Sequence, residues 1–159
     1  IYYENYQGGG STYCMDEESK YCSMHGVVEA NQNVREQCVL DKYGLQAWFD
    51  FTKAINADCS SQNADSCYVD VATDLGYDMD YIEQCFEEEK FNYAAEDARL
   101  MSLFGAQGSP AIYIDGVSYS GARDANSILG AICAEFDEAP QACNSVIESE
   151  IQNAPAGQC

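Results

Sequence analysis

The chain has 159 residues, with 27 acidic and 7 basic side chains and a formal net charge of -20. This length suits one compact domain with its own core. The charge argues against binding to nucleic acids or to anionic membrane surfaces, because both would repel the protein. An acidic excess is typical of the solvated surface of a secreted protein, although it also attracts basic peptides or divalent cations.

Cysteine usage indicates an oxidising compartment. Nine cysteines are present, and none has the Cys-x-x-Cys spacing of a zinc ribbon or a dithiol active site. We therefore expect disulfides and a location outside the cell or in a secretory or vacuolar lumen. We expect no metal site and no cofactor, since His25 is the single histidine. The expected disulfide cysteines are Cys14, Cys22, Cys38, Cys59, Cys67, Cys85, Cys133 and Cys143.

The odd cysteine is assigned to Cys159, which is expected to be free or bonded to another chain. Short separations favour some bridges, but eight cysteines allow many pairings, so spacing alone does not fix the connectivity. The favoured bridges are Cys59 with Cys67 and Cys133 with Cys143, followed by Cys38 with Cys85 across the helical region and Cys14 with Cys22 around a loop.

The first elements expected are a strand and a loop. Residues 1–6 are rich in tyrosine and predict a short strand, which the three glycines at residues 8–10 end. Residues 11–26 contain Cys14 and Cys22 and predict a loop held by a disulfide.

Residues 27–104 predict a series of helices, because apolar side chains recur there at helical spacing. Trp48 and Phe51 are expected to pack between helices rather than to form a ligand-binding patch with Phe49. The single histidine, His25, is expected to be a surface loop residue. The expected helices are two joined at Gly44 within residues 27–58, one that ends before Gly76, one from Asp78 through Cys85, and one from Phe91 to Phe104.

Residues 108–133 predict a hairpin followed by a helix. The apolar run of residues 111–114 and the returning residues 117–119 flank Asp115-Gly116, the strongest short hairpin signal. Asp124 is expected to cap the helix. The apolar face of that helix holds Ile128, Leu129, Ile132 and Cys133.

A proline stands directly before this hairpin. Proline at the start of a strand lacks the amide that its neighbour would use, and it often lies in a tight or cis turn. The arrangement resembles the closing half of a thioredoxin-like domain, in which a cis-proline lies beside the active site and the adjoining backbone pairs with bound peptide. The resemblance implies an interaction site at Ser109, Pro110 and Ala111. In the alternative interpretation, Pro110 shapes the hairpin and binds nothing.

The cysteine framework, the helical segment and the hairpin together resemble the thioredoxin-like region of plant vacuolar sorting receptors, over about residues 13 to 143. The resemblance implies an α/β, thioredoxin-like, disulfide-rich fold with a mainly helical insertion at about residues 27–104 and a small mixed sheet. It also implies a luminal cargo binder rather than an enzyme. The matching pieces are Tyr21-Cys22, residues 33–38, Trp48 to Phe51, Cys59, Cys67, Leu75 to Cys85, Pro110, Tyr119 to Gly121, Cys133 to Phe136 and Cys143.

The sheet is expected to be incomplete in this chain. In thioredoxin-like folds the central strand and the dithiol helix precede the strand assigned here to residues 1–6. We expect the missing strand to come from a longer parent chain or from another subunit, because unpaired strand edges are costly when buried. Residues 1–143 are accordingly expected to form the thioredoxin-like domain, and residues 144–159 a polar tail or linker.

Three functions are compatible with these features. The first is a noncatalytic protein-interaction module that binds a peptide or cargo. The second is a structural subunit of an extracellular fibre or cell-surface appendage, with other copies of itself as partners, joined by strand sharing or an intermolecular disulfide. The third, a disulfide oxidoreductase, is disfavoured because it needs a thiolate beside a resolving cysteine. No run of residues is long and apolar enough to predict a membrane span.

Overall fold

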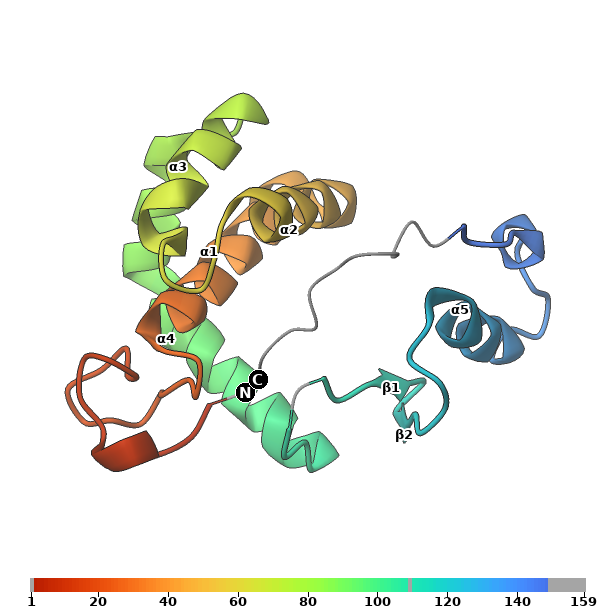
Figure 1. The fold of residues 1–159 in the computed structure, drawn as a ribbon, viewed down its shortest axis with the longest axis horizontal. Coiled ribbons are helices and arrows are strands. Elements are labelled where there is room, and N and C mark those ends of the chain that lie inside the picture. The colour runs from red at the N-terminus through yellow and green to blue at the C-terminus, as the bar shows by residue number, and fades with distance from the viewer. Residues whose placement is uncertain (1, 109, 149–159) are drawn as a thin grey trace. The chain divides into compact units, whose positions relative to one another are not determined.

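The computed structural model describes residues 2–108 and 110–148, so Ser109 and Cys159 lie outside the described residues (Figure 1). The chain divides into two compact units, Ile1–Gly105 and Ala106–Cys159. Within the described ranges, no helix combines the length and apolar character that a membrane crossing requires. The division into a domain of residues 1–143 and a tail of residues 144–159 stays a prediction.

The first unit begins with an irregular segment rather than a strand. Tyr3 forms an isolated antiparallel bridge with Cys22, and a short 3-10 helix follows at Tyr6–Gly8. The prediction of a strand was wrong for residues 2–6, because Asn5 has a φ of 52°, which an extended strand does not permit. The Tyr2 ring packs edge-on against Tyr21 at 6.0 Å, and Tyr3 exchanges two backbone hydrogen bonds with Cys22, so a buried ring and one bridge hold this segment.

A loop held by the Cys14–Cys22 disulfide follows, and four helices then span the segment expected to be the helical insertion. The break at Gly44 is confirmed, since its φ of 84° interrupts the helical path between two otherwise continuous apolar stripes. The Asp78 cap is also confirmed, because its carboxylate accepts a hydrogen bond from the Tyr81 amide at 3.1 Å. The helices are α1 (Val27–Tyr43), α2 (Leu45–Asp58), α3 (Ala64–Asp74) and α4 (Met79–Phe104).

The helix α4 runs without interruption over 26 residues, so the expectation of separate helices on either side of residues 86–90 was wrong. The intervening residues are mostly glutamate, which has a high helix propensity. Lys90 also donates to Glu87 at 2.7 Å across one turn, an arrangement that supports a helix.

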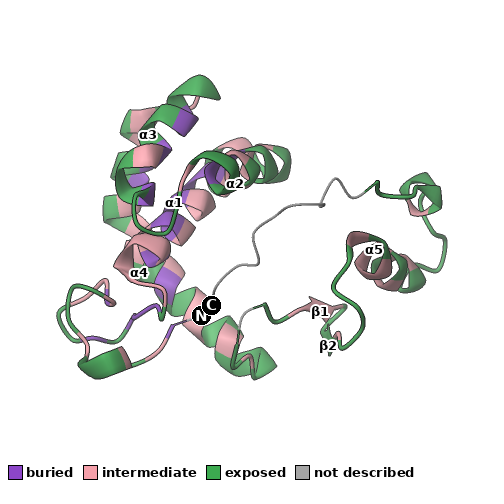
Figure 2. Ribbon diagram, in the orientation of Figure 1, coloured by how far each residue is buried: buried purple, intermediate pink, exposed green. Residues whose placement is uncertain are grey.

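The core of the first unit lies where the four helices face one another (Figure 2). Phe51 and Ile82 are its largest fully buried side chains. The disulfide between Cys38 and Cys85 joins α1 to α4 beside this core. The buried members of the main cluster are Val39, Phe51, Ile55, Tyr68, Val71, Ala72 and Ile82.

A buried arginine holds three of the helices together. Arg35 on α1 is 7% exposed, and its guanidinium lies over the rings of Tyr68, at 4.1 Å, and Phe86, at 4.8 Å. The same group donates to the Asp65 carboxylate at 2.7 Å. Arginine suits this position because its planar, weakly hydrated cation both stacks on rings and pairs with a carboxylate.

The second unit contains a hairpin and one helix. Strands β1 (Tyr113–Ile114) and β2 (Val117–Ser118) pair antiparallel, and both turn residues have positive φ, 47° at Asp115 and 78° at Gly116. The hairpin prediction is confirmed, whereas the described residues contain no parallel strand that would make the sheet mixed. Helix α5 (Ala125–Ala134) begins at the expected cap, since Asp124 accepts from the Ser127 amide at 2.9 Å. A 3-10 turn follows at Gln141–Asn144.

Candidate functional site

The predicted interaction site lies at the entry to the hairpin. Pro110 and Ala111 are exposed, while Ser109 lies outside the described residues. The backbone pairing starts at the next residue, where the Ile112 carbonyl accepts from the Tyr119 amide at 2.9 Å. The backbone of residues 110–111 thus precedes the ladder and is open to solvent. The role of these residues in binding stays a prediction.

The described cysteines are all in disulfides. The described residues also contain no group of three or more histidine, cysteine, aspartate or glutamate side chains that could hold a metal ion. The four disulfides are Cys14–Cys22, Cys38–Cys85, Cys59–Cys67 and Cys133–Cys143.

His25 lies in the turn that precedes α1, as expected for a loop residue, and its side chain is 29% exposed. Its Nδ1 is 2.9 Å from the Glu29 carboxylate, which also accepts a hydrogen bond from the Ser23 hydroxyl. The second ring nitrogen, Nε2, is buried and has no hydrogen-bond partner among the described residues. The group therefore fixes the loop against α1, and the described residues place no nucleophile against Nε2.

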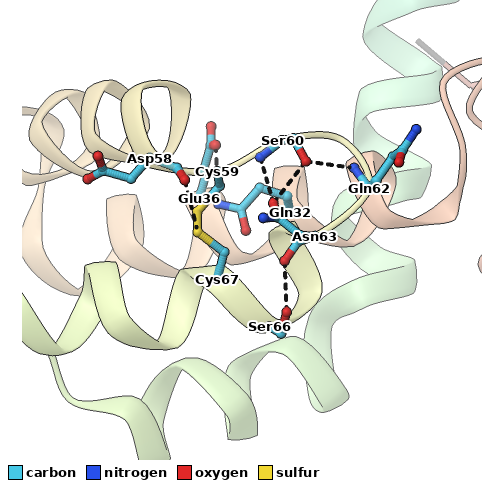
Figure 3. Close-up of a disulfide and its surroundings, with 9 residues drawn as sticks. All are labelled: Gln32, Glu36, Asp58, Cys59, Ser60, Gln62, Asn63, Ser66 and Cys67. Atoms are coloured by element: carbon cyan, nitrogen blue, oxygen red, sulfur yellow. Dashed lines mark hydrogen bonds between the residues drawn. A yellow bond between two sulfur atoms is a disulfide. The ribbon is translucent and has the colours of Figure 1, made fainter.

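A cavity of about 360 Å³ lies between α1, α2 and the loop closed by the Cys59–Cys67 disulfide. We call it the α1–α2 pocket, and we call residues 59–67 the disulfide loop. The volume of the α1–α2 pocket is within the range typical of ligand pockets. Figure 3 shows the Gln32 and Glu36 side chains reaching from α1 toward the disulfide loop. The polar lining includes Glu29, Gln32, Glu36, Thr52, Asn56 and Ser60.

A short hydrogen-bond network fixes the inner wall of this pocket. The Thr52 hydroxyl donates to one Glu36 oxygen at 3.0 Å, and the Gln32 amide donates to the other at 3.3 Å. Gln32 is 5% exposed, yet its Oε1 has no hydrogen-bond partner among the described residues. The wall thus contains a carboxylate that accepts a hydrogen bond at each oxygen and, beside it, a buried acceptor without a partner among the described residues.

Comparison with known proteins decides the family. The model of the vacuolar sorting receptor thioredoxin-like domain matches residues 8–133, which is most of the chain. The chain belongs to this family. Vacuolar-sorting receptor 5 of Arabidopsis thaliana is 24% identical over 171 residues, covering 87% of this chain. The aligned region is 27% of that receptor, so the chain spans about a quarter of its length. No solved structure matches the chain.

The lining of the α1–α2 pocket was missed in the sequence, although Glu36 lies in a segment that resembles the sorting receptor family. Gln32 and Glu36 are one helical turn apart, so they occupy the same face of α1. Polar residues at that spacing beside the apolar Val39 and Val34 positions could have indicated a polar wall. The partner from α2, Thr52, could not be found this way, because the contact depends on how the two helices pack.

The Glu36 carboxylate carries an electrostatic cost that a pH series can measure. Burial raises the pKa of its carboxyl above the ordinary 4.5, although the hydrogen bonds from Thr52 and Gln32 oppose this. Above pH 4.5 the unfolded chain loses this proton first, so the folded state becomes relatively less stable until its own, higher pKa is passed. We expect the free energy of unfolding of wild type, relative to Glu36→Gln, to fall as the pH rises through this window.

Urea unfolding at a series of pH values, followed by the fluorescence of Trp48, measures this difference. The control is Glu83→Gln, an exposed glutamate of α4 with the same change in charge. The difference in the free energy of unfolding between Glu83→Gln and wild type should vary much less over the same pH range. If the free energy of unfolding of wild type, relative to that of Glu36→Gln, instead rises with pH, burial does not raise the pKa of the Glu36 carboxyl.

Proposed function

We propose that the chain is a noncatalytic protein-binding module, located outside the cell or in a secretory or vacuolar lumen, that binds an extended peptide or cargo segment at residues 109–111. Membership of the sorting receptor thioredoxin-like family supports a receptor-like role. The four disulfides suit an oxidising compartment, where such bonds persist.

The observation that carries the proposal is the open apolar surface of the second unit taken by itself. Residues 106–108 and 110–148 form a hairpin and a helix with apolar side chains, and this unit by itself buries none of its described residues. Val117, Ile132 and Phe136 are 70%, 42% and 51% exposed. Apolar side chains that the unit does not itself bury are available for contact with another segment. An extended peptide that adds alongside a strand obtains backbone hydrogen bonds from the edge and contacts from such side chains.

The test selects short random peptides displayed on phage against the immobilised chain and measures the selected peptides by calorimetry. We expect amide hydrogen exchange to slow at residues 111–119 when a peptide binds. Replacing Ala111 by proline removes one amide and should weaken binding about three- to tenfold, as expected for one lost hydrogen bond. The matched control, Ala139→Pro, makes the same change at another exposed position and should bind as wild type does.

Other results would overturn the proposal. Equal affinities of wild type and Ala111→Pro would remove residues 109–111 from the site. Long polymers under the electron microscope would support the fibre subunit instead. Reduction of insulin by the chain would support an oxidoreductase.

A further inference from the structure

The α1–α2 pocket has a rigid wall on the side of the disulfide loop. Besides the Cys59–Cys67 bond, the Asn63 side chain accepts from the Ser60 amide at 2.6 Å and from the Ser60 hydroxyl at 3.0 Å (Figure 3). The start of α3 is held against α1 by the ion pair between Asp65 and Arg35. A wall fixed in this way binds a ligand without first having to be ordered, which favours affinity.

The charge of the residues that line the pocket favours a positively charged ligand. Its lining contains two carboxylates and no lysine, arginine or histidine; the Glu29 carboxylate already pairs with His25 and Ser23 outside the lining, whereas Glu36 has no basic partner among the described residues. The chain around it has a net charge of -20, so no excess of positive charge elsewhere compensates for them. Burial of the Glu36 carboxylate without a basic partner is costly, and a bound cation would offset that cost.

The hydrogen-bonding groups of the pocket favour a ligand that carries hydrogen-bond donors, because they include acceptor atoms with free capacity. The Oε1 atom of Gln32 is a buried acceptor without a partner, which is an unfavourable state that a ligand N–H would relieve. The Glu36 oxygens each accept one hydrogen bond and retain capacity for more. At the rim, the Asn33 and Asn56 side chains line the pocket and add further polar groups.

A metal ion does not match this arrangement as well as an organic cation does. The described residues hold no group of three or more side chains that could ligate a metal. The volume of about 360 Å³ is that of a pocket for a side chain or a small organic group rather than for a single ion. A guanidinium group presents several N–H donors in one plane together with its charge, and it pairs with carboxylate and amide oxygens in fixed geometry.

We infer that the α1–α2 pocket binds an arginine side chain of a peptide partner, with its guanidinium donating to Glu36 and to Oε1 of Gln32. Glu29 also lines the pocket, but its two oxygens already contact His25 and Ser23. The site lies on α1 and α2 in the first unit and uses none of residues 109–111. It therefore does not rest on the proposed strand addition, and either site can fail without the other.

The experiment uses the whole chain and a pair of short peptides that differ at one position. One peptide carries a central arginine between glycine and serine residues, and the other carries citrulline, which has the same shape without the charge. Titration calorimetry and amide chemical shifts measure their binding. We expect the arginine peptide to bind and to shift the amides of α1, α2 and the disulfide loop, and the citrulline peptide to bind at least about tenfold more weakly.

Variants separate the pocket from general attraction by an acidic protein. Glu36→Gln should weaken arginine binding about tenfold or more, since it removes a charged hydrogen-bond partner. Asp70→Asn changes the net charge equally at an exposed position of α3 outside the pocket, and should have little effect. Asn56→Arg, at the exposed rim, places a tethered cation beside the pocket and should compete with the peptide. Ala111→Pro should leave arginine binding unchanged.

Each contrary result is decisive. Equal weakening by Glu36→Gln and Asp70→Asn would assign the attraction to net charge and overturn the inference. So would equal binding of the arginine and citrulline peptides, or absence of binding by both at millimolar concentration. Circular dichroism shows whether Glu36→Gln keeps its helices, and Asn56→Arg provides an independent result because its substitution is on the surface.

Discussion

Replacing both Cys38 and Cys85 by alanine is expected to lower the free energy of unfolding of the first unit by about 4 kcal/mol. The disulfide joins α1 to α4 across a sequence separation of 47 residues, so its loss frees a long loop in the unfolded chain. Both residues are buried, at 0% and 7% exposure, and packing in the folded state adds to the effect. Guanidinium unfolding followed by Trp48 fluorescence measures the change.

The matched control removes the bond between Cys59 and Cys67, which lies in the same unit but spans a separation of 8 residues. Loop-closure entropy predicts a smaller loss there, about 2.5 kcal/mol. The test is whether removal of the Cys38–Cys85 bond lowers the free energy of unfolding more than removal of the Cys59–Cys67 bond does. If the control destabilises the unit as much as the Cys38–Cys85 variant does, the explanation by loop length is wrong, and if neither variant changes the unfolding midpoint, the bonds do not form in the protein.

The elements that were predictable from the sequence are those whose signals lie within a few residues. Asp115-Gly116 requires a turn with positive φ at both positions, which holds wherever the hairpin lies in the fold. Gly44 ends one helical stripe and begins the next, and Asp78 caps the helix that follows it. Local chemistry of this kind is unaffected by what packs against it.

The errors arose where tertiary packing decided the conformation. Tyrosine favours strands, yet Tyr2 is 4% exposed in a cluster with Tyr21, and the chain turns at Asn5 to place it there. The charged residues of α4 separate two apolar stretches, but their high helix propensity and the ion pair of Lys90 with Glu87 keep them in one helix.

The α1–α2 pocket was beyond sequence reasoning for a related reason. Gln32 and Glu36 are neighbours along α1, but the hydroxyl of Thr52 reaches them from another helix. The disulfide loop then closes the third side of the pocket through the bond between Cys59 and Cys67. The spacing of the cysteines in the sequence does not by itself determine which of them are bonded. A binding site assembled from three segments needs their relative positions, which a single sequence does not provide.

The second large effect is expected for Phe51→Ala, which should lower the free energy of unfolding by about 3–5 kcal/mol. Phe51 is 0% exposed and its ring meets the Tyr77 ring edge-on at 6.0 Å, so truncation leaves a cavity at the centre of the four helices. Urea unfolding followed by circular dichroism measures the loss. Phe51→Leu, which retains most of the volume, should cost about 1.5 kcal/mol or less.

The neighbouring Phe49 provides a control of the same residue type on the same helix. Phe49 is 53% exposed and contacts the Trp48 ring at 4.8 Å, so Phe49→Ala removes an aromatic contact without opening the core. Its expected cost is about 1 kcal/mol. Comparable losses for the two alanine variants would contradict the placement of Phe51 in the core. Because Thr52 follows Phe51 directly, collapse of α2 into the cavity would also displace the hydroxyl that holds Glu36, so Phe51→Ala should weaken arginine binding even under conditions where the variant remains folded.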